Sequence, residues 1–340
     1  MVTMDPPHHT DARSVLAKLL TPKRLKENED FMWRLADRHI DEFIADGKCE
    51  FLAAYAKPFS LLAVADLLGV PESDHEEFRE AFGAERPGSN IGGLDHEVVA
   101  TNPLAWADEK FARYIVDRRE SPRDDVLTSI AMAKYPDGST PEVDDVVRTA
   151  TFLFAAGQET TAKLLGAAMR VLSDRPDIQQ QLRDDRSLIP VFIEECLRMD
   201  SPVKKSVFRM ARKSTTLGDT PVPAGTTVMV SPGAANRDPQ RFDNPHEFSL
   251  ERKNVREHIA FSRGIHSCPG APPLARVEVE SRSSGSSTGW ATSRSARRST
   301  GRAMPAITSM SRRSSCVGSP RSTSSSRRST ERRQGVGSGT

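Results

Sequence analysis

A long stretch of helical apolar spacing, residues 140–172, constrains the fold more than any other feature of this sequence. Apolar residues recur along it every three or four positions, and no proline follows Pro141 within it. We expect Thr140 to cap this helix and Pro141 to lie in its first turn. At about 1.5 Å per residue the helix is about 45 Å long, so it must cross the whole domain.

The rest of the sequence predicts shorter helices followed by small β segments. Helical spacing and breakers place helices over residues 11–20, 23–45, 60–68, 72–82, 106–117 and 124–134, and two more between residues 178 and 199. A Gly/Pro/Asn-rich stretch at residues 87–93 separates two of them. β-Branched residues then predict a strand at 207–210, a hairpin-like stretch at 221–230 and an irregular meander at 236–248. We therefore expect a mainly α fold.

The end of the chain differs in composition from the rest. Residues 281–340 contain 12 Arg, no Lys, 19 Ser and one acidic residue, Glu331, a net charge of +11. Because the whole chain carries +2, residues 1–280 carry −9. We expect a globular domain over 1–280 and a disordered Ser/Arg-rich tail over 281–340. Two explanations of this tail are open: loss of the reading frame near Glu280, or a basic segment that binds nucleic acid. The scarcity of aromatic residues in the tail argues against specific recognition of nucleic acid.

Cysteine usage and hydropathy exclude several classes of protein. The four cysteines, Cys49, Cys196, Cys268 and Cys316, form no CxxC pair, which argues against a disulfide scaffold or a zinc ribbon. No apolar run is long enough to span a membrane, and the first twenty residues lack the apolar core of a signal peptide. We expect a cytoplasmic protein without a membrane anchor.

The most specific motif surrounds one of these cysteines. Phe261, Gly264, His266, Cys268 and Gly270 share a ten-residue stretch, a spacing with a chance probability of about 10⁻⁴ to 10⁻⁵ in a chain of this length. A cysteine between glycines, on a loop that enters a helix, can bring its sulfur and several backbone N–H groups to one flat ligand. Those dipoles stabilise a thiolate, the form that binds iron. The alternative is an inert buried cysteine on a turn.

This stretch resembles the haem-binding loop of the cytochrome P-450 haem-thiolate monooxygenases, F-G-x-G-x-H-x-C-x-G followed by L-A-R, present here as Leu274-Ala275-Arg276. The resemblance implies the cytochrome P-450 fold, of the bacterial type without a membrane anchor, and haem b, iron protoporphyrin IX, as cofactor. It makes Cys268 the axial iron ligand and Phe261 the ring that shields its sulfur. Gly270 and His266 then belong to the haem site as well.

A second motif lies inside the long predicted helix. Ala156, Gly157, Glu159 and Thr160 are similar to the family's oxygen-activating A-G-x-E-T-T segment. Glycine disfavours helix by about 1 kcal/mol relative to Ala, and the Thr160 hydroxyl can bond to the carbonyl of Ala156 four residues earlier. We expect the helix to open locally here. The resemblance assigns Ala156 and Gly157 to an oxygen groove and Glu159 and Thr160 to a proton path; the alternative is a kink packed in the core.

Basic residues in the family's order complete the predicted site. His9 and Arg13 share one helix face, and with Arg209 and His266 they match positions that contact the two haem propionates in relatives. For any one of them a solvated side chain is the default explanation, whereas the four together in the family's order favour the haem site. A further motif, Glu195 with Arg198 and later Arg252, matches a buried ionic triad that we assign to structure.

The implied reaction inserts one oxygen atom of O₂ into a small apolar substrate of the lipid, steroid or terpenoid class. Electrons are expected from a ferredoxin or flavodoxin with an NAD(P)H-dependent reductase. The sequence also departs from the pattern. It matches the family only from its C helix onward, so we expect a fold incomplete at both ends; Ser262 replaces a glycine, and residues 271–273 carry one extra position. The alternative function is therefore an inactive or non-folding remnant of such an enzyme.

Overall fold

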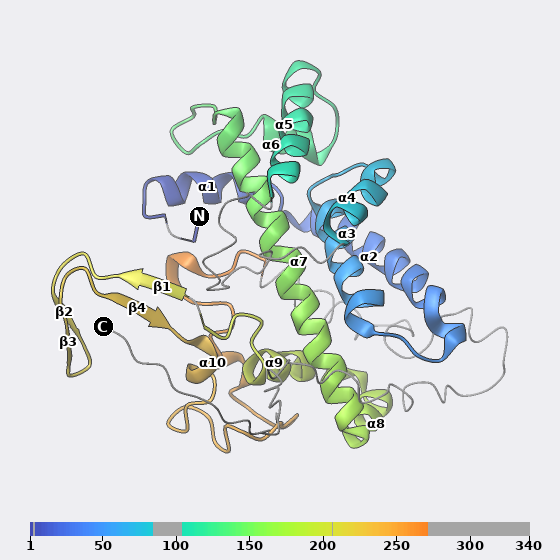
Figure 1. The fold of residues 1–340 in the computed structure, drawn as a ribbon, viewed down its shortest axis with the longest axis vertical. Coiled ribbons are helices and arrows are strands. Elements are labelled where there is room, and N and C mark those ends of the chain that lie inside the picture. Colours follow the sequence, from blue (N-terminus) through green and yellow to red (C-terminus); the bar gives the residue numbers. More distant parts are fainter. Residues whose placement is uncertain (3, 84–103, 206, 271–340) are drawn as a thin grey trace, which may run out of the picture.

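The computed structural model describes residues 1–2, 4–83, 104–205 and 207–270 (Figure 1). The predicted loop at 87–93, the extra position at 271–273, the L-A-R segment, the domain boundary at 280 and the basic tail lie outside the described residues.

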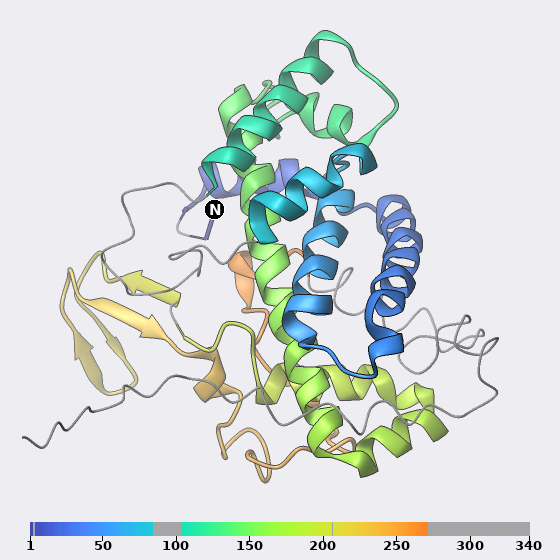
Figure 2. The ribbon, with the colours of Figure 1, turned by 45° about the vertical axis from the view of Figure 1, so that its right-hand side comes forward.

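One long helix, α7 (Val143–Asp174, 32 residues, about 48 Å), runs through the molecule (Figures 1 and 2). It is preceded by α1 (His8–Ala17), α2 (Pro22–Phe43), the π-helical turn η2 (Leu52–Ala56), α3 (Lys57–Leu67), α4 (His75–Gly83), α5 (Ala105–Glu120) and α6 (Val126–Ala131). It is followed by α8 (Pro176–Asp184), α9 (Ile189–Met199), α10 (Pro232–Ala235) and the short turn η7 (Gly264–His266). Helices α2, α3 and α4 lie on one side of α7, and α1 and the strands lie on the other.

Prolines explain where several helices begin. Helices α1 and α3 start three residues earlier than predicted, because Pro7 and Pro58 stand at or inside the first turn, where proline is tolerated. The prediction that Thr140 caps α7 is wrong: α7 starts after Glu142, and the Thr140 hydroxyl accepts a hydrogen bond from Lys134 instead. Pro141 lies before the helix because Arg119 Nη2 donates to its carbonyl (2.6 Å).

The strands form two separate two-stranded antiparallel sheets. Strand β1 (Val207–Met210) pairs with β4 (Thr227–Val230), and β2 (Thr215–Leu217) pairs with β3 (Thr220–Val222). The predicted hairpin at 221–230 is therefore wrong, since its two halves pair with earlier strands. Gly225, with φ +83°, turns the chain between them and donates its N–H to the carbonyl of Ala211 (2.7 Å). The strand at 207–210 and the irregular meander at 236–248 are confirmed.

The core follows α7. Toward its N-terminal half, edge-to-face aromatic contacts join Phe154 of α7 to Phe78 of α4 and Phe111 of α5, all fully buried. Toward its C-terminal half, Leu164 and Ala168 pack against side chains of α8 and α9. The mainly α fold predicted from apolar spacing is confirmed. Among the described helices, none combines the length and the apolar character needed to span a membrane.

Candidate functional site

The cysteine loop closes on itself between Phe261 and Cys268. The amide of Cys268 donates to the carbonyl of Phe261 (2.8 Å), and the amide of Ser267 donates to that of Gly264 (3.0 Å). Cys268 is exposed and lies two residues after the end of η7. In both ribbon views the η7 segment lies beside the middle of α7 (Figures 1 and 2). The thiol is thus presented on a closed turn next to the long helix.

Two residues of this turn have left-handed backbone. Gly264 has φ +71°, which glycine adopts readily. Ser262, which stands where the family's loop has a glycine, has φ +60°, a conformation that residues other than glycine disfavour. An L-residue in this conformation costs about 1–2 kcal/mol. The loop therefore holds its shape against a local backbone penalty at Ser262.

The middle of α7 has a run of partly exposed residues. Residues 156–161 are all partly exposed, between segments that are mostly buried. The Thr160 hydroxyl donates to the carbonyl of Ala156 (2.7 Å), the bond predicted from their spacing. Helix α7 is nevertheless uninterrupted from Val143 to Asp174, so the predicted local opening is wrong for this structure.

Packing explains the glycine at position 157. A Cβ on Gly157 would lie 2.7 Å from Cγ2 and 3.4 Å from Cγ1 of Val64, a buried residue of α3. Contacts this short between carbon atoms are strongly repulsive. The glycine therefore lets α3 and α7 approach closely, a role that the sequence did not reveal because Val64 is distant along the chain.

Gly157→Ala is expected to lower the free energy of unfolding by about 1–3 kcal/mol, because overpacking outweighs the gain in helix propensity of about 1 kcal/mol. Urea unfolding measures it. Gly166→Ala in the same helix is the control, since its Cβ would meet only the end of the exposed Leu52 side chain. Adding Val64→Ala should relieve part of the loss, as a double-mutant cycle would show. A Gly157→Ala chain as stable as the unmodified chain contradicts this packing.

The predicted proton-path acid has a partner that the sequence analysis missed. Oε1 of Glu159 lies 2.6 Å from Nζ of Lys163, one helical turn further along α7. The side chain of Glu159 is 22% exposed and that of Lys163 is 49% exposed. The i,i+4 spacing of Glu and Lys was a signal that could have found this pair. In this arrangement Glu159 interacts with Lys163, and Thr160 with Ala156.

Four basic residues predicted for the cofactor gather near the cysteine loop; we call His9, Arg13, Arg209 and His266 the cationic cluster. His9 is buried, and its ring meets that of His266 edge-on, with centroids 4.5 Å apart. Burial is the main cause that lowers the pKa of His266 below its usual 6.5. His9, Arg209 and Arg13 lower it further through their charges, whereas Asp5 raises it. Segments far apart in sequence thus form one electropositive surface.

Arg209→Gln is expected to raise the pKa of His266, because it removes a positive charge that disfavours the imidazolium. Titration of the ring protons by NMR measures the change, with Arg212→Gln as the matched control. Since the pKa in the folded state lies below 6.5, this histidine costs folding stability as the pH falls below 6.5 and costs nothing above it. An unchanged or lowered pKa in Arg209→Gln would contradict the cluster.

The ionic triad predicted for structure is confirmed. Arg198 and Glu195, both fully buried on α9, form two hydrogen bonds of 2.7 and 2.8 Å, and Arg252 Nε lies 3.0 Å from Glu195 Oε1. Arg198 also donates to three main-chain carbonyls of the meander, those of Asn236, Pro245 and Glu247. The triad therefore ties α9 to the segment that leads into the cysteine loop.

A second buried pair on α9 was missed. Glu194, the neighbour of the triad glutamate, lies 2.8 Å from Nε2 of His258, and both residues are buried. The sequence offers two signals for this pair: the adjacent acids Glu194 and Glu195, and a histidine three residues before Phe261. Because 64 residues separate Glu194 from His258, no spacing rule predicts their contact.

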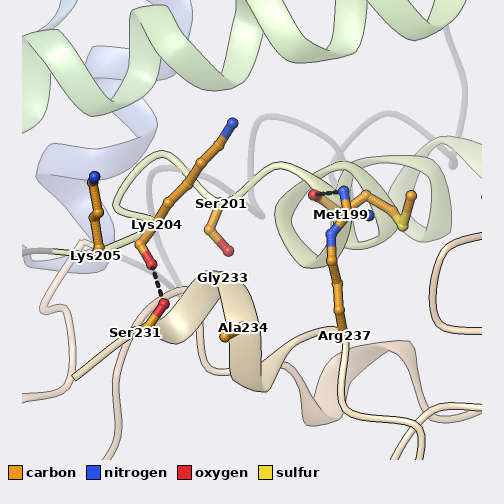
Figure 3. Close-up of a pocket in the computed structure, with 8 residues that line it drawn as sticks. All are labelled: Met199, Ser201, Lys204, Lys205, Ser231, Gly233, Ala234 and Arg237. Carbon is orange, nitrogen blue, oxygen red and sulfur yellow. Dashed lines mark hydrogen bonds between the residues drawn. The ribbon is translucent and has the colours of Figure 1, made fainter.

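The structure also has a cavity of about 230 Å³, lined by residues other than those of the predicted site (Figure 3). Its lining includes the side chains of Lys204, Lys205 and Arg237, near the end of α9 and the start of α10. Arg237 is occupied by the carbonyl of Met199 (2.6 Å), and Lys204 pairs with Asp200. None of the predicted cofactor or catalytic residues lines this cavity.

Comparison with known proteins agrees with the geometry of the loop and the long helix. The family model described as Cytochrome P450 matches residues 107–281. Cytochrome P450 107B1 of Saccharopolyspora erythraea is 33% identical over 280 residues, which cover 82% of this chain and 67% of that protein. Cytochrome P450 144 of Mycobacterium tuberculosis is 37% identical over 284 residues, covering 82% and 64%. The chain thus spans about two thirds of the length of these relatives.

Solved structures give the same result. Substrate-free CYP150A6 of Mycobacterium marinum is 65% identical with a TM-score of 0.74, and the match covers 81% of this chain and 63% of that one. CYP109E1 of Bacillus megaterium, solved in complex with testosterone, is 30% identical with a TM-score of 0.72, covering 82% and 74%.

Proposed function

This chain belongs to the cytochrome P450 family, and on that premise we propose that it is a haem-thiolate monooxygenase. It would insert one atom of O₂ into a small apolar molecule with two externally supplied electrons. The single observation that carries the proposal is the convergence of the cationic cluster beside the loop that presents Cys268.

The residues present fit haem b, the cofactor of this family. The donor set is one exposed thiol with four basic side chains, as an iron porphyrin with two carboxylates requires. Cys268 would supply the iron ligand as a thiolate, and the cationic cluster would bind the propionates. When bound, the cofactor supplies the iron at which dioxygen is activated. The partly exposed turn of α7, residues 156–161, would lie on the opposite side of it.

Within this function Thr160 and Glu159 would hold and pass on the protons that oxygen activation consumes. The Thr160 hydroxyl now donates to Ala156, so to donate elsewhere it must rotate away from that carbonyl. Glu159 is partly exposed and paired with Lys163, and it can exchange protons with solvent. Ala156 and Gly157 would leave room for oxygen because neither carries a side chain larger than a methyl group.

Thr160→Ala is expected to lower product formed per NAD(P)H consumed, because loss of a general acid slows the step that it serves by about 10²- to 10⁴-fold. Thr161→Ala, the neighbouring threonine, is the control. Product and NAD(P)H are measured together with a soluble ferredoxin and its reductase. Equal coupling in Thr160→Ala and the unmodified chain would remove Thr160 from the proposed proton path.

Two exposed apolar side chains lie on the sheet that carries Arg209. Phe208 and Met229, opposite each other on β1 and β4, are 42% and 50% exposed, and they share the face of this sheet opposite to that of Arg209. A lipid, steroid or terpenoid is the proposed class, and CYP109E1, a relative by structure, was solved with testosterone. The proposed electron donors are a ferredoxin or flavodoxin with an NAD(P)H-dependent reductase, and the proposed location is the cytoplasm.

The proposal is tested by reducing the haem-loaded chain under carbon monoxide. A Soret band at about 450 nm supports thiolate ligation, and a band at about 420 nm indicates a damaged site. If no band appears, the chain is a remnant without cofactor. Incorporation of label from ¹⁸O₂ into an apolar substrate would then establish the reaction.

A further inference from the structure

The buried pair of Glu194 and His258 connects α9 to the segment that carries Cys268, and no step of the proposed function uses it. Glu194 is 2% exposed and His258 is 6% exposed, and Nε2 of the histidine lies 2.8 Å from Oε2 of the glutamate. A carboxylate this deeply buried requires a hydrogen-bond partner. Here the partner is His258, which lies between the meander and the cysteine loop, 64 residues further along the chain.

The hydrogen bonds of His258 fix its tautomer. The amide of Ala260 donates to Nδ1 (3.2 Å), so Nδ1 is an acceptor and carries no proton. The proton is therefore on Nε2, which donates it to Glu194. One imidazole thus holds two groups at once: the Glu194 carboxylate of α9, and the amide of Ala260, the residue directly before Phe261.

The contacts continue from His258 to the sulfur-bearing residue. The amide of Ile259 donates to Oδ1 of Asn236 (2.7 Å), and the ring of Phe261 packs against that of His258 with centroids 5.9 Å apart. The carbonyl of Phe261 in turn accepts the amide of Cys268 (2.8 Å). Each residue from 258 to 261 is therefore held by a contact, and the last of them holds Cys268.

We propose that Glu194 and His258 are positioning residues for the Cys268 sulfur. Together they fix the backbone of residues 258–261. The hydrogen bond from the Cys268 amide to the Phe261 carbonyl then fixes Cys268 relative to that backbone. The proposal rests on the proposed function in that the sulfur is the haem ligand. It differs from the role of the ionic triad, whose side-chain hydrogen bonds end in the meander before residue 258.

Two variants and a matched control test it. His258→Phe retains a ring of similar size against Phe261 but loses both hydrogen bonds, whereas Glu194→Gln keeps an acceptor for Nε2–H. His246→Phe changes an exposed histidine of the same meander. We expect His258→Phe to convert most of the carbon monoxide band from about 450 to about 420 nm, with Glu194→Gln and His246→Phe close to the unmodified chain.

A second readout needs no cofactor. In the haem-free chain, amide hydrogen exchange at Cys268 should be about tenfold faster in His258→Phe than in the unmodified chain, while exchange in α2 and α3 is unchanged. The proposal is overturned if His258→Phe keeps the band near 450 nm and the exchange rate, or if both change only in proportion to a fall in the global unfolding midpoint. If the unmodified chain shows no band near 450 nm, the proposed function fails, and the exchange rates still decide whether this pair positions the loop.

Discussion

Cys268→Ser is expected to abolish the carbon monoxide band near about 450 nm completely. A serine hydroxyl stays protonated at neutral pH and is a poor ligand for iron, whereas a thiolate donates electron density to it. The substitution should leave the fold intact, because the side chain is exposed and the loop is closed by the Cys268 amide rather than by the sulfur. The measurement is the reduced difference spectrum, with circular dichroism to verify folding.

The control is Cys49→Ser, which changes a half-buried cysteine in the connection between α2 and η2. It should retain the full band. A Cys268→Ser chain that keeps both the band and the haem content of the unmodified chain would show that another residue ligates the iron.

Glu195→Gln is expected to cost about 3–5 kcal/mol of unfolding free energy, the largest stability loss that we anticipate for one substitution. It leaves Arg198, which is fully buried, and Arg252, whose side chain is 6% exposed, without the carboxylate that compensates their charge. The Ser249 amide also loses its ionised acceptor. Denaturant unfolding monitored by circular dichroism measures the loss, and the slope should stay constant if the transition remains two-state.

The comparison is Asp177→Asn, which removes an exposed ion pair with Arg175 at the start of α8. Such pairs contribute little to stability, because solvent screens them. If Glu195→Gln were no more destabilising than Asp177→Asn, the triad would not hold α9 to the meander.

Features encoded over a few residues could be predicted from the sequence. The apolar spacing of α7 and the bond from Thr160 to Ala156 depend on local geometry, and the structure has both. The cap at Thr140 could not be predicted, because a hydrogen bond from Arg119 to Pro141 keeps the preceding residues out of the helix. The strand pairing could not be predicted either. The chain turns at Gly225, so that the two halves of the segment 221–230 pair with two different earlier strands, β2 and β1.

For the site, residue types were easier to predict than their contacts. His9 and His266 were assigned to one ligand by resemblance, and the structure brings their rings together. The packing of Gly157 on Val64 and the pairing of Glu194 with His258 join residues distant in sequence, so no spacing rule could reveal them.

X-ray absorption at the iron edge of the haem-loaded chain tests the central claim most directly. One sulfur ligand at about 2.3 Å is predicted for the unmodified chain, and none for Cys268→Ser. A first shell of nitrogen and oxygen alone in the unmodified chain, or a sulfur ligand that persists in Cys268→Ser, would contradict the assignment of Cys268 to the iron.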